Sequence, residues 1–168
     1  MTERDRLVDQ LEREIKGQPW HGPSLRSIVE GLSADQAAHK PSRDAHSIWE
    51  ILLHMTGWKR EVGRRAQGHA AAEPAGGDWP PVGDISESRW RAAQDDHLEA
   101  HRELIELARG LSDAQLDTKV KGNPADYIGA GITVRATLYG ILQHDCYHAG
   151  QIAILKKIGG GTIRYDGL

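Results

Sequence analysis

Apolar residues recur every three or four positions along four stretches of this chain, and this spacing constrains the fold more than any other feature. The repeat puts apolar side chains on one face of an α-helix, where they can be buried. We expect helices at about residues 4–16, 47–67, 88–108 and from 133 to the glycine run at 159–161, with a shorter helical piece starting near Pro23. The sequence therefore predicts a single all-α domain over residues 1–168.

Two local patterns support these helix boundaries. Ser47 and Glu50 have the spacing of a capping box, in which each side chain accepts a hydrogen bond from the other residue's backbone amide. Residues 31–36 and 110–115 are nearly the same sequence, and each follows a predicted helix. A glycine followed by Ser-x-x-Gln is typical of a helix stop and a new N-cap. An old duplication of a two-helix unit is the alternative explanation of this repeat.

The second and third long helices are separated by a Pro- and Gly-rich linker at residues 69–85, HAAAEPAGGDWPPVGDI. Antiparallel neighbours in a helix bundle need only about 2–8 connecting residues. This linker can cross the length of a bundle, so a simple up-down-up-down order is not required. A second long connection, KVKGNPADYIGAG, precedes the last helix.

The composition argues against several classes of protein. The net charge is −3, with scattered Lys and Arg, which disfavours nucleic acid as a partner. No apolar run approaches the roughly 20 residues that span a bilayer, and the charged N-terminus has no signal-peptide core. A single cysteine, Cys146, leaves no internal disulfide framework. We therefore expect a cytoplasmic protein.

Three histidines lie on the apolar faces of two predicted helices. His144 and His148 are four residues apart and share one face, and His54 lies on the apolar face of the second helix. One metal ion held by all three would satisfy these otherwise buried polar rings. Imidazole suits Zn, Ni, Cu or Co, whereas Mg and Ca prefer oxygen ligands. A fourth position could stay open for water, substrate or a thiolate. The alternative is that each ring is an ordinary hydrogen-bonded core residue.

Other residues on or near these helices could support the site or simply pack. The chain lacks the Glu that directly follows the first His in His-Glu-x-x-His metalloproteases. His97 and His101 could add a ligand, a proton shuttle or a substrate contact, or could lie in water at the bundle edge. Gln151 could orient a ligand histidine. Gly140 could leave space beside the metal, while Cys146 points away from His144 and is expected to be inert.

The segments HSIWEILLHMTGWKR and LQHDCYHAGQIAILKK, with WHGPSL upstream, resemble the DinB-like (DinB/YfiT) superfamily over roughly residues 20–157. The resemblance implies a four-helix bundle with long crossover connections. It also implies a divalent metal, zinc or nickel, bound by His54, His144 and His148. Trp20, in the upstream segment, is expected to pack against the bundle, although it could instead line the mouth of the site.

The resemblance also implies an activity. Characterised relatives include bacillithiol S-transferases and mycothiol-dependent isomerases, in which the metal would hold a low-molecular-weight thiol as its thiolate. We therefore expect a thiol-dependent S-transferase that joins such a thiol to an electrophilic small molecule. A metal-dependent hydrolase and a non-catalytic metal-binding module of a stress response are the alternatives. A homodimer is also expected, because short bundles leave apolar faces uncovered.

Overall fold

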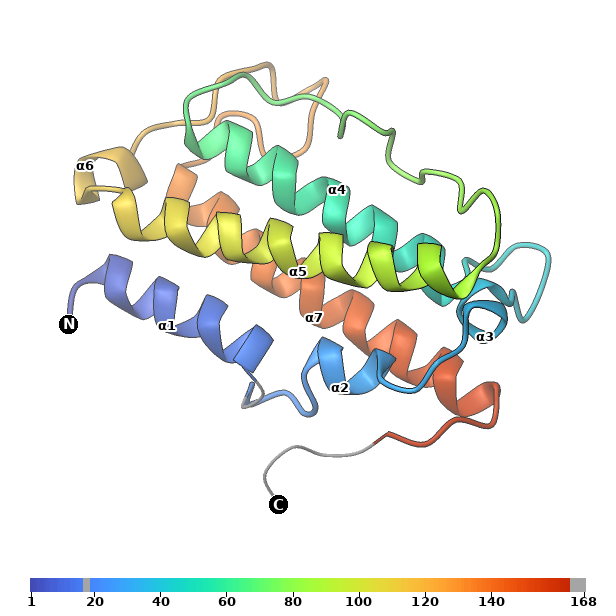
Figure 1. Ribbon diagram of the computed structural model, residues 1–168. Coiled ribbons are helices and arrows are strands. Elements are labelled where there is room, and N and C mark those ends of the chain that lie inside the picture. The colour runs from blue at the N-terminus through green and yellow to red at the C-terminus, as the bar shows by residue number, and fades with distance from the viewer. Residues whose placement is uncertain (17–18, 164–168) are drawn as a thin grey trace.

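The expected all-α fold is confirmed. The computed structural model describes residues 1–16 and 19–163 (Figure 1). Its helices are α1 (Glu3–Lys16), α2 (Leu25–Val29), α3 (Ala34–Ala38), α4 (Ile48–Ala66), α5 (Glu87–Gly110), α6 (Asp113–Leu116) and α7 (Val134–Ile158). Within the described ranges, β pairing is limited to two isolated bridges, Ala70–Lys121 and Lys119–Thr133. None of the helices in these ranges is long and apolar enough to cross a membrane.

The helix ends follow the predicted capping signals. Ser47 accepts from the Glu50 amide at 3.1 Å, and the Glu50 carboxylate accepts from the Ser47 amide at 2.8 Å, which completes the capping box of α4. Ser33 and Ser112, in the two similar segments, form capping boxes at α3 and α6. The repeated sequence is therefore a helix-stop and cap signal in both places. Each such cap is worth about 1 kcal/mol.

The four longest described helices pack along one another. α4 lies against both α5 and α7, and α1 covers α5 and α7 from the other side (Figure 1). The linker at residues 67–86 runs back along the length of α4, so α4 and α5 point in the same direction (Figure 1). α1 and α7 run the opposite way. This is the crossover order that the sequence resemblance implied.

The core consists of two apolar clusters with buried polar residues between them. One cluster gathers Leu104, Ile141 and their neighbours where α4 ends and α7 begins. The other gathers Met55, Ile152 and their neighbours at the opposite end. Between them lies the polar layer, which we define as Glu14, Lys59, His97, His101 and Asp145. Burying charge is costly unless each group is paired, so this layer requires its internal contacts.

Candidate metal centre

The packing of α4 against α7 brings the three predicted ligand histidines together. His54 comes from the middle of α4, and His144 and His148 come from successive turns of α7. One ring nitrogen from each lies within 4.8 Å of the other two. His54 and His148 are buried, and the His144 side chain is 26% exposed. The three rings therefore converge where α4 packs against α7, with His144 the most exposed of them.

Hydrogen bonds orient two of these rings. The Nδ1 of His54 lies 2.7 Å from the carbonyl oxygen of Asp78, and the Nδ1 of His148 lies 2.7 Å from Oε1 of Gln151. Both oxygens are acceptors, so each Nδ1 carries the proton and each Nε2 presents a lone pair. This pattern, in which a carbonyl group holds the outer nitrogen, is typical of metal-binding histidines.

The inner nitrogens of His54 and His144 face one another, and the tautomer of His144 decides whether a proton lies between them. Nε2 of His54 lies 3.0 Å from Nε2 of His144. Nδ1 of His144 is buried and has no hydrogen-bond partner in the described part of the chain, and Oδ1 of Asp145 lies 3.6 Å away. If His144 carries its proton on Nδ1, facing that carboxylate, two lone pairs meet at 3.0 Å. A cation between them removes the conflict, so the residues present fit a metal ion.

The electrostatics keep two of the candidate ligands, His144 and His148, neutral. Burial, with smaller effects from His148 and His54, lowers the pKa of His144 from 6.5 to about 3. Burial also lowers the pKa of His148, although its hydrogen bond to Gln151 opposes that shift. Neutral imidazole is the form that binds a metal. The centre is therefore ready to accept a cation at neutral pH without first losing protons from these two rings.

An aromatic residue of the long linker covers the centre. The Trp79 ring stacks on His54 at a centroid distance of 4.0 Å and on His46 at 3.6 Å, with both pairs nearly parallel. The preceding residue, Asp78, holds the linker in place by accepting a 2.7 Å hydrogen bond from Nε1 of Trp58. The linker thus supplies both an orienting carbonyl and an aromatic wall.

A cavity of about 510 Å³ adjoins the centre. His148, a member of the histidine group, lines this cavity together with Gln151 and Trp79. The remaining lining residues are Asp44, Ala45, His46, Ile51, Tyr147, Ile154 and Leu155. Neither Lys nor Arg is among these lining residues. Its walls are mainly aromatic and aliphatic, which suits an uncharged, partly apolar molecule.

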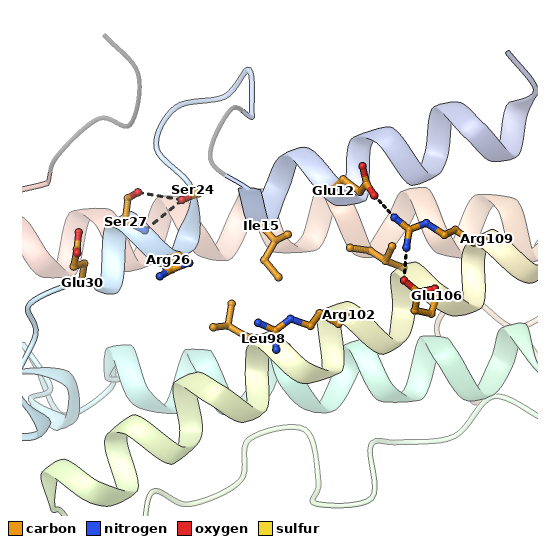
Figure 2. A pocket seen from close by; sticks show the side chains of 11 residues that line it. Glu12, Ile15, Ser24, Arg26, Ser27, Glu30, Leu98, Arg102, Glu106 and Arg109 are labelled. Atoms are coloured by element: carbon orange, nitrogen blue, oxygen red, sulfur yellow. Dashed lines mark hydrogen bonds and ion pairs between the residues drawn. The ribbon is translucent and has the colours of Figure 1, made fainter.

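A larger cavity, about 650 Å³, lies elsewhere, between α1, α2 and α5 (Figure 2). None of the three clustered histidines lines it. Arg109 at its edge is paired with both Glu12 and Glu106, as the dashed lines of Figure 2 mark. Ile15 and Leu98 face each other across the groove (Figure 2). The volume of this groove does not by itself indicate a reaction, so we place the candidate function at the three histidines.

His97 and His101 are buried, and neither joins the histidine group. Nδ1 of His97 lies 2.9 Å from the hydroxyl oxygen of Thr56, and Nε2 of His101 donates to the Leu11 carbonyl at 2.8 Å. Burial lowers the pKa of His97 well below 6.5 and that of His101 to about 4. The expectation that they could lie in water is wrong, because α1 and α4 cover this face of α5.

A second group of possible ligands occurs in the polar layer. Glu14, His101 and Asp145 each place one ligand atom within 4.8 Å of the others. The Lys59 ammonium bonds to Asp145 and lies 3.4 Å from Glu14, so it already supplies a positive charge there. Burial lowers the pKa of Lys59, and Glu14 opposes that shift. A divalent ion at this position would have to displace Lys59, which makes the three-histidine group the better metal site.

Several residues at the centre were missed or misjudged from the sequence. Asp78 and Trp79 lie in the linker and His46 precedes α4, so apolar periodicity does not mark any of them. The Trp in the Pro-rich linker is the sequence feature that could have indicated packing. Gly140 was expected to make room beside the metal, but a Cβ there would meet open space. Trp20 neither packs nor lines the site, because it is fully exposed.

Cys146 points away from the histidine group, as its position on the helix predicted. It is a free, exposed cysteine on α7, and it belongs to neither group of possible metal ligands. Partial burial raises the pKa of its thiol. A raised thiol pKa lowers the fraction of reactive thiolate, so nothing at this position suggests a nucleophile.

A family model described as DinB superfamily matches residues 20–152, well over half of the 168 residues. The matched region includes the three histidines, the linker and the Lys59–Asp145 pair. A search of curated proteins and a search of solved structures found no match.

Proposed function

The chain belongs to the DinB superfamily, and from that premise we propose that it is a divalent-metal-dependent enzyme, of the thiol-dependent S-transferase type. The observation that carries the proposal is the convergence of three imidazoles from α4 and α7, with Nε2 of His54 3.0 Å from Nε2 of His144 and His148 beside them. Three neutral imidazoles leave a bound ion its full positive charge and an open position.

In this proposal His54, His144 and His148 hold zinc or nickel, the ions that imidazole ligands suit. When bound, such an ion would supply the positive charge that stabilises a thiolate, the reactive form of a thiol. The chain contributes the orientation of the rings, through the Asp78 carbonyl and Gln151. Rings held in this way lose little freedom when the ligand set closes, which favours binding.

The adjoining cavity would bind the electrophile. Trp79 and Tyr147 offer aromatic surface next to His148, and the lining includes neither Lys nor Arg. An uncharged electrophile with an apolar body therefore suits this cavity better than an anionic one. Bacillithiol and mycothiol are the thiols that the family resemblance suggests. Transfer would form a sulfur–carbon bond as the leaving group departs, and the thiol proton would pass to solvent.

The first experiment measures metal content. Elemental analysis of tag-free protein should find about one zinc or nickel per chain in the wild type, and almost none in His54→Ala or His148→Ala. His69→Ala is the matched control, because His69 is exposed and outside the histidine group. Wild-type protein that binds neither metal, even after reconstitution, would refute the metal site.

The second experiment tests the reaction. Metal-loaded protein is mixed with monochlorobimane, with and without bacillithiol or mycothiol. Product that forms only with a thiol supports the transferase, with chloride as the leaving group. Turnover of ester or amide substrates without a thiol would support a metal-dependent hydrolase instead. Metal binding without turnover across a broad panel would favour a non-catalytic binding module.

A further inference from the structure

A buried ion pair lies directly behind the candidate metal centre. Lys59 of α4 and Asp145 of α7 are each about 1% exposed, and they form a salt bridge with each other. Asp145 is the next residue after His144, and Lys59 lies five residues after His54. The pair therefore joins the same two helices that carry the three histidines.

Two unpartnered polar atoms meet between this pair and the centre. Oδ2 of Asp145 accepts from Lys59, but Oδ1 has no hydrogen-bond partner in the described residues. The same is true of Nδ1 of His144, and these two buried atoms lie 3.6 Å apart. Binding a metal through Nε2 requires the proton of His144 to be on Nδ1, which makes Nδ1 a donor facing an acceptor.

His54 and His148 each have a hydrogen-bond acceptor next to Nδ1. The Nδ1 of His54 has the Asp78 carbonyl at 2.7 Å, and the Nδ1 of His148 has Gln151 at 2.7 Å. Among the three, His144 alone lacks such a partner within the described ranges. The nearest group that can complete the set is the free oxygen of Asp145.

We propose that Asp145 is the positioning residue of His144, and that Lys59 holds Asp145 in place for that role. This inference rests on the proposed metal site. Oδ1 of Asp145 accepts a hydrogen bond from Nδ1–H of His144, while its Oδ2 accepts one from Lys59. In this way the Asp145 carboxylate sets both the ring orientation and the tautomer of His144.

The charges of the polar layer support this role. Lys59 contacts two carboxylates, Asp145 and, at 3.4 Å, Glu14. Burial keeps His101, which borders Glu14, neutral. Two carboxylates share the single ammonium of Lys59, and Oδ1 of Asp145 is left facing His144. A cation bound at Nε2 of His144 would attract the Asp145 carboxylate on the other side of the ring, and the low-dielectric surroundings would strengthen that attraction.

A contribution to the stability of the fold does not readily explain the polar layer. Buried ion pairs are often no better for stability than apolar side chains of similar size. Lys59 interrupts the apolar face of α4 between Met55 and Val62, which belong to the two separate core clusters. A function for the pair at the adjacent centre gives a reason for charge at this depth.

The test compares zinc affinity, measured by competition with a chromophoric chelator. Asp145→Ala removes the acceptor and should weaken zinc binding about 10- to 100-fold. Asp145→Asn keeps an oxygen acceptor but loses the charge, so a smaller loss is expected. Lys59→Met leaves Asp145 unpaired and can fail to fold, so the double variant Lys59→Met/Asp145→Asn, which removes both charges, is measured beside it.

Glu61→Gln is the matched control. Glu61 and Arg65 form another buried ion pair on α4, with a 2.9 Å contact, and it includes no candidate ligand. Glutamine keeps an acceptor for the Ala72 amide, which Glu61 binds at 2.8 Å. A general cost of disturbing buried charge would therefore appear in the unfolding free energy of this variant but not in its zinc affinity.

The second readout is specific to His144. In zinc-loaded, ¹⁵N-histidine-labelled protein, the Nδ1–H signal of His144 should be lost or strongly shifted in Asp145→Ala, while those of His54 and His148 remain. Unchanged zinc affinity and an unchanged His144 signal in Asp145→Ala would overturn this inference and leave the proposed metal site standing. A wild type that binds no metal would overturn both.

Discussion

Acid should destabilise the metal-free protein through His101. This residue is about 2% exposed, and its Nε2 donates to the Leu11 carbonyl. Burial, reinforced by the positive charge of Lys59, lowers its pKa from 6.5 to about 4. At pH values above 6.5, the ordinary pKa of histidine, the His101 ring is neutral in both the folded and the unfolded protein. As the pH falls below 6.5, the ring binds a proton in the unfolded chain but stays neutral in the folded protein. The free energy of unfolding therefore decreases until the pH reaches about 4, the pKa in the folded state.

The size of this effect follows from the two pKa values. Each pH unit in that window costs about 1.4 kcal/mol. Integrated from neutral pH to about pH 5, His101 alone removes about 2 kcal/mol of stability. Domains have about 5–15 kcal/mol in total, so this loss is readily measured.

The assay compares the wild type with His101→Gln by urea unfolding in the presence of a chelator. Glutamine can keep a donor for the Leu11 carbonyl, and it does not titrate. Lowering the pH from about 7.5 to about 5 should therefore cost the wild type about 2 kcal/mol more than the variant. Parallel stability curves for the two proteins would show that His101 is protonated in the folded state and would refute the reasoning.

Three further predictions concern the centre and α7. Gly140→Ala should raise the unfolding free energy by up to about 1 kcal/mol without changing zinc affinity, because a Cβ there meets open space; a loss of zinc binding would contradict this. Trp79→Ala removes two ring stacks, each worth about 0.5–1.5 kcal/mol. It should also raise the KM for an apolar electrophile in steady-state assays, and an unchanged KM would show that Trp79 does not contact the electrophile. Removing the metal should lower the midpoint temperature of thermal unfolding. Free metal at about 100 times its Kd should restore about 2.7 kcal/mol of unfolding free energy, and a midpoint that does not change on adding metal would argue against binding.

Much of the fold could be predicted from local patterns. The capping box of Ser47 and Glu50 placed the start of α4 correctly, and the glycine run after Ile158 placed the end of α7. Caps and apolar periodicity act within a few residues of each other, so a sequence displays them directly. The shared face of His144 and His148 follows from the same helical geometry.

The surroundings of the histidines could be predicted less well. His97 and His101 have the same four-residue spacing as His144 and His148, yet they lie in the polar layer and bind Thr56 and Leu11. Helical spacing states which side chains share a face, but not which neighbouring helix that face meets. Only the packing of α1 and α4 against α5 separates these two pairs of histidines.

By itself, the sequence determined the helices, their buried faces and the three histidines that could share a metal. Only the tertiary structure decided what surrounds them: the linker folds back to put Asp78 and Trp79 beside His54, and Lys59 meets Asp145 across the core. The physical reason is range. Helix formation depends on neighbours within a turn or two, whereas these contacts join residues far apart in the chain, and the packing of whole helices selects them.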